Sequence, residues 1–456
     1  MDRSRNLTSM AREALDERTL GAEAVELLSE LIRIDTVNPP GNEGPAQDLL
    51  GGLLANAGFE CEQLEAEPGR PNLIARLPGT APGPTLCFLS HVDTVPANPD
   101  EWSFSPWSGD VRDGNVLGRG GQDMKDQVAT EVAAAARLAR SGWRPATGEL
   151  KVIVTADEEM GAHLGAKWLC EQHPDKAHAD LVVNEGGGAV FEVDGRRFYS
   201  VAVGEKGVFR FRLRARGRAG HGSVPSLGDN ALLRLAPVLT RLTEQPALEA
   251  TPAGVAFLSG VLGREVGTDA SALEQALDDL RMLSPLLAAY LAEPMLRVTL
   301  VPTKVSASTR ENVIPSVAEA VIDCRVPPGL DEAGVRRRIE PVLGELGDKV
   351  EIEFTETVSG NESPLDTDFA AMLREWVADV DPEATVVPTV MPGFSDSHWF
   401  RKAFGSSVVY GFHPQREIDL FTSAPLVHGA DERAAVADVE LAAAFYEWLA
   451  RRVLGG

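Results

Sequence analysis

The sequence TLCFLSHVDTVP (85–96) joins an apolar run to a histidine and an aspartate two residues apart. Two later segments share this design: KVIVTADEE (151–159) and DLVVNE (180–185) are short apolar runs that end in carboxylates. Apolar runs without alternation, separated by helical patterns, are typical of strands buried on both faces. The three segments predict a parallel or mixed sheet, with helices on both faces and polar side chains at its strand ends.

Helical patterns surround these strands. Apolar spacing predicts helices over 23–33 and 126–140, and a final helix over about 439–454. These patterns predict that the first half and the end of the chain form one α/β unit of the doubly wound type.

A different pattern begins near Gly204. VFRFRLRAR (208–216) alternates strictly, with four arginines on one face, which predicts a half-exposed antiparallel strand. We favour a solvated sheet face over a nucleic-acid patch, because the net charge is −25. The elements that follow complete the order β-α-β-β-α-β of a ferredoxin-like unit. They are a helix over 230–243, strands over 296–307 and 319–326, a helix over 331–346 and a strand over 349–354.

These patterns predict an α/β catalytic domain with a mixed sheet, interrupted by a smaller α+β ferredoxin-like domain. The catalytic domain takes residues 1–205 and 357–456, and the smaller domain takes 206–356. An insertion at about 248–296, with a helix pair over 270–291, is longer than an ordinary connection.

Composition restricts the possible partners and location. Of 456 residues, 44% are hydrophobic and 24% charged, as in globular proteins. The acidic balance argues against nucleic acid and anionic membranes as partners. Acidic residues interrupt the apolar stretches of the N-terminal segment, so we expect no signal sequence, no anchor and a cytoplasmic location. The four cysteines match no zinc or redox spacing and are expected to be reduced core residues.

His91 and Asp93 follow the first apolar run, where Asp93 is placed to orient His91 as a metal ligand. A hydrogen-bonded surface pair is the alternative. Asp123 lies in GRGGQDMKD (118–126), a glycine-rich loop before a helix. The loop lacks the spacing of a phosphate-binding motif, and a helix N-cap is the alternative role for Asp123.

Asp157, Glu158 and Glu159 end the second run, and Glu185 ends the third. Adjacent carboxylates at a buried strand end repel one another, so a cation is expected beside them, although an acidic solvated turn remains the alternative. Histidine and carboxylate ligands together suit Zn²⁺, Co²⁺ or Mn²⁺.

Here the sequence resembles the M20 metallopeptidases and deacylases, which include desuccinylases, aminoacylases and glutamate carboxypeptidase. The resemblance covers nearly the whole chain. It rests on motifs in family order: SHVDTVP, GRGGQDMKD, DEEMGA, NEGGG, GHGS (220–223), ENVIP (311–315), DCRVPPG (323–329) and HGADE (428–432).

The resemblance implies two divalent ions per subunit, zinc above all, with cobalt or manganese as alternatives. Asp123 would bridge them, with His91 and Glu185 completing one site and Glu159 and His428 the other. It also implies that Glu158 is the general base, that Asp93 orients the first histidine, and that the peptide after Asp123 is cis.

In the smaller domain the resemblance implies that His221 polarises the scissile carbonyl, often from a partner subunit. Asn312 and Arg325 would hold the substrate's carbonyl and carboxylate, and Gly393 would lie near the substrate. An ordinary loop histidine and a surface salt bridge are the alternatives for His221 and Arg325. In the same segment as Gly393, Asp396 fits the family pattern and His398 departs from it.

The implied enzyme is a two-metal amidohydrolase, either deacylase or carboxypeptidase, acting on an N-acyl amino acid or short peptide with a free carboxylate. A metal-bridging water activated by Glu158 would attack the amide. The smaller domain would serve as a lid and dimerisation domain in a homodimer. An M28-like aminopeptidase and a non-catalytic metal-binding interaction protein are the alternatives.

Overall fold

The computed structural model describes residues 19–456, and these divide into two compact units. The first unit is 19–201 together with Asp366–Val386 and Ser395–Gly456; the second is Ala202–Leu365 with Val387–Phe394. Residues 1–18 lie outside the described residues, so the prediction about the N-terminal segment falls partly outside them. Among the described helices, none has the length and apolar character needed to cross a bilayer.

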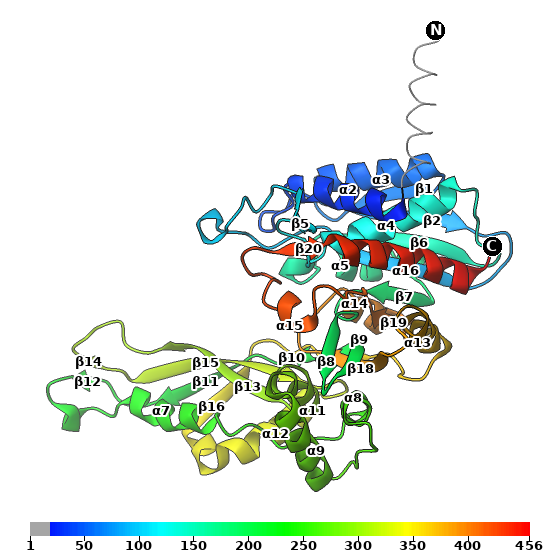
Figure 1. Ribbon diagram of the computed structural model, residues 1–456. Coiled ribbons are helices and arrows are strands. Elements are labelled where there is room, and N and C mark those ends of the chain that lie inside the picture. Colours follow the sequence, from blue (N-terminus) through cyan, green and yellow to red (C-terminus); the bar gives the residue numbers. More distant parts are fainter. Residues whose placement is uncertain (1–18) are drawn as a thin grey trace. The chain divides into compact units, whose positions relative to one another are not determined.

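A mixed sheet forms the centre of the first unit, as the sequence predicts (Figure 1). Four neighbouring strands, β6, β3, β7 and β19, run parallel, whereas β1 and β2 continue the sheet antiparallel. The order is β1 (Glu60–Glu65), β2 (Pro71–Pro78), β6 (Glu149–Thr155), β3 (Thr85–His91), β7 (Leu181–Asn184), β19 (Val408–Gly411) and β9 (Arg196–Glu205). β8 (Val190–Val193) pairs with β9.

Successive residues of β3 and β6 are all buried after the first position, which indicates that both faces of the sheet are covered. Helices provide this cover. One packed group consists of α2 (Leu20–Arg33), α3 (Gly44–Ala57), α4 (Lys125–Arg140) and α16 (Val436–Leu454). A second group includes α5 (Ala166–Gln172) and α14 (Ser397–Ala403), while α13 (Asp368–Val380) also contacts α16. The alanines of α4 give it little bulk, so it lies buried along almost its whole length.

The carboxyl ends of β6, β3 and β7 lie side by side, since β3 pairs in parallel with both neighbours. His91 is the last residue of β3, the carboxylates of 157–159 follow β6, and Glu185 follows β7. Parallel strands present their loops at one edge of the sheet, so this topology brings the three motifs together.

A small sheet of β4 (Asp110–Arg112), β5 (Asn115–Leu117) and β20 (Arg433–Ala435) connects distant parts of the first unit. β20 pairs antiparallel with β5. This pairing places the chain that carries His428 next to the loop that carries Asp123.

The second unit contains an antiparallel sheet, and its main elements follow the predicted chain order β-α-β-β-α-β. β16 (Val350–Phe354) pairs with β11 (Phe211–Arg216), β11 with β15 (Val317–Val326), and β15 with β13 (Thr299–Ser306). α7 (Ala231–Arg241) and α12 (Glu332–Leu343) pack on it around a core that includes Phe211, Leu213 and Ile322. The predicted long strand is interrupted, because β10 (Gly207–Val208) and β11 pair separately with β15.

The arginine face of β11 is a solvated sheet face, as predicted. Arg212 Nη1 lies 3.3 Å from Glu353 Oε2, and Arg216 Nε lies 2.6 Å from Glu351 Oε1. Arg214 pairs in the same way with Glu319. Acidic partners on the neighbouring strands thus balance these arginines.

The insertion contains more helix than the predicted pair. α8 (Pro252–Leu262) and α9 (Ala270–Leu283) pack together. Three short turns follow, α10 (Pro285–Leu287), η4 (Ala288–Ala292) and α11 (Glu293–Leu296). α8 escaped prediction because it is apolar on nearly all sides and shows little helical periodicity.

Candidate metal centre

Imidazole and carboxylate side chains from five segments of the first unit meet at the ends of β6, β3 and β7. Two groups of donors could hold a metal ion, His91 with Glu158 and Glu185, and His91 with Asp123 and Glu159. The donor atoms of each group all lie within 4.8 Å of one another.

Asp123 lies at the centre of this cluster and faces both histidines. Its Oδ1 is 3.2 Å from His91 Nε2, and its Oδ2 is 3.0 Å from His428 Nε2. His428 Nε2 is also 3.1 Å from Glu159 Oε2, while His91 Nε2 is 3.8 Å from Glu185 Oε1. One carboxylate therefore joins two donor sets, each with one histidine and one glutamate.

The loop around Asp123 has the geometry that the family resemblance implies. The Asp123–Met124 peptide is cis. Met124, and not Asp123, occupies the N-cap position of α4, and no side chain caps the helix there. The Asp123 carboxylate therefore faces the cluster instead of capping the helix.

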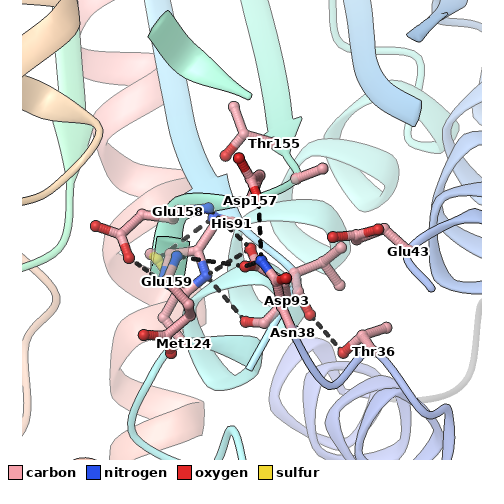
Figure 2. Close-up of polar contacts among 12 residues, drawn as sticks. Thr36, Asn38, Glu43, His91, Asp93, Met124, Thr155, Asp157, Glu158 and Glu159 are labelled. Carbon is pink, nitrogen blue, oxygen red and sulfur yellow. Dashed lines mark hydrogen bonds and ion pairs between the residues drawn. The ribbon is translucent and has the colours of Figure 1, made fainter. Parts of the chain in front are cut away.

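Asp93 organises the residues on both sides of it (Figure 2). His91 Nδ1 is 3.0 Å from the backbone carbonyl oxygen of Asp93. The same nitrogen is 3.4 Å from Oδ1 of the Asp93 carboxylate. The same carboxylate accepts hydrogen bonds from the backbone N–H groups of Glu158 and Glu159, at 3.2 and 3.3 Å. Asn38 Nδ2 donates at 2.8 Å to Asp93 Oδ2, the oxygen that also accepts from Glu159 N.

Asp157 does not join the metal donors. It has a left-handed backbone, with φ of 67°, and its carboxylate accepts hydrogen bonds from Asn38 Nδ2 and Leu164 N at 3.1 and 3.0 Å. Arg70 Nη1 lies 3.2 Å from the same carboxylate. These contacts hold the turn after β6, so only two of the three consecutive carboxylates enter the cluster.

Burial and mutual repulsion shape the electrostatics of the cluster. Burial raises the pKa of Glu158 and Glu185 well above the ordinary glutamate value, and neighbouring carboxylates raise it further. Hydrogen bonds to Asp123 and Glu159 raise the pKa of His428 to about 10. The effects of the neighbouring carboxylates show that negative charge is in excess here, a condition that a divalent cation relieves.

The donor set fits a pair of such cations. Ligands about 2.1 Å from a tetrahedral zinc ion lie about 3.4 Å from one another. The contacts around Asp123 are close to this spacing, from 3.0 to 3.8 Å. Glu159 Oε1 is moreover a buried oxygen without a hydrogen-bond partner among the described residues, and such an atom is costly unless a cation or donor satisfies it.

Comparison with known proteins agrees with this chemistry. The model of peptidase family M20/M25/M40 matches residues 87–452. The chain belongs to this family. The resemblance drawn from the motifs is thus confirmed, and the M28-like alternative is set aside.

One curated relative is the succinyl-diaminopimelate desuccinylase of Parvibaculum lavamentivorans. It is 35% identical over 227 residues, which are 48% of this chain and 54% of the relative. The corresponding protein of Gluconobacter oxydans is 34% identical over 232 residues, 49% of this chain and 57% of the relative. The matches thus span only about half the length of these relatives.

Solved structures share the fold over nearly the whole chain. The M20 family metallo-carboxypeptidase Sso-CP2 from Sulfolobus solfataricus matches with a TM-score of 0.69 and 19% identity, covering 94% of this chain and 98% of that one. The Bacillus subtilis YXEP protein, described as a dinuclear metal binding peptidase from the M20 family, has a TM-score of 0.62 and 15% identity and covers 95% and 98%.

The remaining predicted site residues of this M20 chain lie in its second unit. His221 is exposed in β12 (Gly220–His221), which pairs with β14 (Val313–Ile314), and its Nδ1 is 2.7 Å from Ser223 Oγ. Gly222 N donates to the Asn312 carbonyl at 2.8 Å, so the two motifs are neighbours. Arg325 lies on β15 and donates through Nε to Asp323 at 2.8 Å. Gly393 also falls within the second unit.

Asp396 and His398 are both buried near the start of α14. Asp396 accepts a hydrogen bond from the Thr155 hydroxyl at the end of β6, and its charge raises the pKa of Glu158 and Glu185. The His398 ring packs edge-on against Trp399, and burial lowers its pKa to about 4. His398 is therefore a neutral core residue.

Sequence reasoning missed Asn38 and Arg70, which hold the acidic turn. Asn38 lies in NPPG (38–41), which marks only a turn, and Arg70 lies between a turn and a strand. Neither position lies in a sequence pattern that predicts its contact with Asp157, which is about ninety or more residues away.

Proposed function

We propose that this chain is a two-metal hydrolase that cleaves an amide bond in a small substrate bearing a carboxylate. The observation that carries the proposal is the position of Asp123, whose two oxygens each face a histidine. We assign His91, Asp123 and Glu185 to one ion, and Asp123, Glu159 and His428 to the other. Zinc suits these donors best, with cobalt and manganese as alternatives.

Bound ions would polarise the substrate carbonyl and make an attacking water more acidic. Glu158 is the general base that takes the proton from this water and returns it to the leaving amine. Its backbone N–H is held by Asp93, which supports a fixed direction for its side chain. Asp93 also orients His91 through the ring nitrogen opposite the donor atom.

The second unit would bind the substrate. We propose that His221 stabilises the developing oxyanion, because Ser223 fixes its Nδ1 and so the direction of its ring. Arg325 would bind the substrate carboxylate through its planar guanidinium, with Asn312 and Gly393 beside the substrate. Asp323 supports this role by holding Arg325 Nε.

An N-acyl amino acid is the substrate class that we place first, because the similar curated proteins are succinyl-diaminopimelate desuccinylases. An N-succinyl amino acid would carry a carboxylate at each end. Short peptides cleaved from the carboxyl end are the second class, and the products of the reaction separate the two.

We further propose a homodimer that forms through the second unit. β13 pairs with β15, and no described strand pairs with its other edge. Val301 and Val305 on β13 are 52% and 49% exposed, and Leu233 on α7 is 70% exposed. The unpaired backbone groups of an exposed edge strand can pair with those of a second copy. Light scattering of the wild type and of Val301→Lys tests this, with a monomeric variant expected.

A cytoplasmic location remains our prediction. It is supported by the four cysteines, which are all free, with Cys87, Cys170 and Cys324 buried. Cell fractionation tests it directly.

The decisive experiment screens zinc-, cobalt- and manganese-loaded protein against N-acyl amino acids and dipeptides, with liquid chromatography of the products. We expect hydrolysis that a chelator abolishes. Glu158→Gln should retain both ions and lose about 10² to 10⁴-fold in turnover. Asp110→Asn, an exposed carboxylate of β4, is the matched control and should behave as the wild type. Protein that binds two ions but hydrolyses no substrate would instead be a non-catalytic metal-binding protein.

A further inference from the structure

Glu432 binds the loop that presents Asp123. Its Oε1 accepts hydrogen bonds from the backbone N–H groups of Gln122 and Asp123, at 2.7 and 3.0 Å. Its Oε2 lies 2.5 Å from Arg119 Nη1, and both side chains are buried, with exposed fractions of 0% and 3%. A single carboxylate thus satisfies two backbone donors on the loop and the guanidinium beside it.

The same pair reaches the segment of His428. Arg119 Nη2 donates to the His428 carbonyl oxygen at 3.3 Å. Gly118 N donates to the Glu432 carbonyl at 3.0 Å, and Gln122 Nε2 to the Arg433 carbonyl at 2.9 Å. Segments 118–123 and 428–433, more than 300 residues apart in the chain, are thereby tied at several points.

The segment of His428 needs such support. His428 and Asp431 both have left-handed backbones, with φ of 59° and 57°, in which residues other than glycine are strained. The His428 side chain is 53% exposed, so packing does little to fix it. Ser103 N donates to Asp431 at 2.7 Å and holds the far end of the loop. The contact from Arg119 holds the end next to the imidazole.

We propose that Glu432 and Arg119 form a clasp that sets the position of Asp123 against His428 and thereby the affinity for the second ion. Both are positioning residues, since neither belongs to the donor set. A buried ion pair is by itself weak evidence for stabilisation. We assign this pair a geometric role because it contacts both segments that carry metal donors. Outer partners of metal ligands typically contribute 10 to 100-fold in metal affinity. The inference rests on the proposed two-metal centre.

The test is calorimetric titration of the full chain, first stripped of metal, with zinc and with manganese. The wild type should bind two ions. Glu432→Ala and Arg119→Gln should bind the first ion almost normally and the second 10 to 100-fold more weakly. Glu432→Gln keeps an oxygen for the two backbone N–H groups, so it should lose less affinity than Glu432→Ala.

Glu23→Gln is the matched control. Glu23 is also a buried carboxylate of the first unit, and it pairs with Arg137 and Arg140 on α4, away from the donor cluster. This variant should bind both ions with the affinity of the wild type. If Glu23→Gln lowers the affinity for the second ion as much as Glu432→Ala does, the effect is a general loss of stability and the clasp is refuted.

Two other outcomes also overturn the proposal. If Glu432→Ala and Arg119→Gln bind both ions as the wild type does, the clasp has no role in metal binding while the two-metal centre stands. If the wild type binds fewer than two ions, the proposed function fails and the clasp fails with it. Should Glu432→Ala not fold, Arg119→Gln and Glu432→Gln carry the comparison.

Discussion

The metal centre and the arginine face of β11 are both dense in charge, yet they differ in burial and balance. In the metal centre, four carboxylates surround two histidines, and burial raises the pKa of Glu158 and Glu185. Within residues 19–456, one buried oxygen of Glu159 has no hydrogen-bond partner. On β11, partly exposed arginines pair with glutamates of the neighbouring strands β15 and β16, and Arg216 lowers the pKa of Glu351.

The difference teaches which charges point to a function. Exposed pairs that neutralise one another contribute little to stability and require no further partner. Buried carboxylates in excess are costly unless a cation joins them.

Asp123→Ala should abolish activity, because the bridging carboxylate is removed from both donor sets. Loss of the stabilisation that the ions give the transition state corresponds to about 10³-fold or more in kcat/KM. Elemental analysis should find less than one ion per chain. Arg214→Gln on β11 is the control, with unchanged activity and metal content. If Asp123→Ala had the metal content of the wild type, Asp123 would not be a metal ligand.

Glu131 is a buried carboxylate of the first unit that forms no ion pair with any residue of 19–456. It accepts hydrogen bonds from Ser90 and Gln127, both at 2.8 Å, and burial raises its pKa to about 8. The unfolded chain releases this proton near pH 4.3, whereas the folded chain retains it up to about pH 8. Stability should therefore fall as pH rises between these values.

Glu131→Gln should remove this fall, so the variant gains up to about 3 kcal/mol over the wild type at pH 7 and nothing at pH 4. Urea unfolding at both pH values, followed by tryptophan fluorescence, measures the difference. Glu351→Gln, on the exposed face, should show no gain at pH 7. Equal stability of Glu131→Gln and the wild type across the range would contradict the buried, protonated state of Glu131.

Removing metal should destabilise the first unit. An ion present at 100 times its dissociation constant stabilises the folded state by about 2.7 kcal/mol. Added chelator should therefore lower the melting temperature of the wild type, and readdition of zinc should restore it. The same treatment should leave Asp123→Ala unchanged. If chelator did not change the melting temperature of the wild type, the folded first unit would not bind ions at the proposed metal centre.

Single substitutions on the β11 face should have the smallest effect. Arg214→Gln removes one partner from a network in which Glu319 also contacts Arg212. We expect a melting temperature within experimental error of the wild type, with weak dependence on salt. A large loss would show that this face is structural after all.

Local sequence patterns predicted the strands, the mixed sheet and the polar side chains at its strand ends, because buried runs and strand ends leave a signature in consecutive residues. The roles of Asp123 and His428 as donors came only from the family resemblance. Strict alternation in residues 208–216 predicted one strand of the second sheet, but it did not predict the break before Phe211. Asn38, Arg70 and Arg119 could not be predicted as supports. Their partners lie far away in the sequence, and a single polar residue in a loop has many possible contacts.

Zinc-edge anomalous diffraction from crystals of the zinc-loaded chain tests the central claim most directly. We predict two peaks in the first unit. Asp123 should contact both, His91 and Glu185 only one, and Glu159 and His428 only the other. A single peak that Asp123 does not contact, or peaks away from the ends of β6, β3 and β7, would contradict the account.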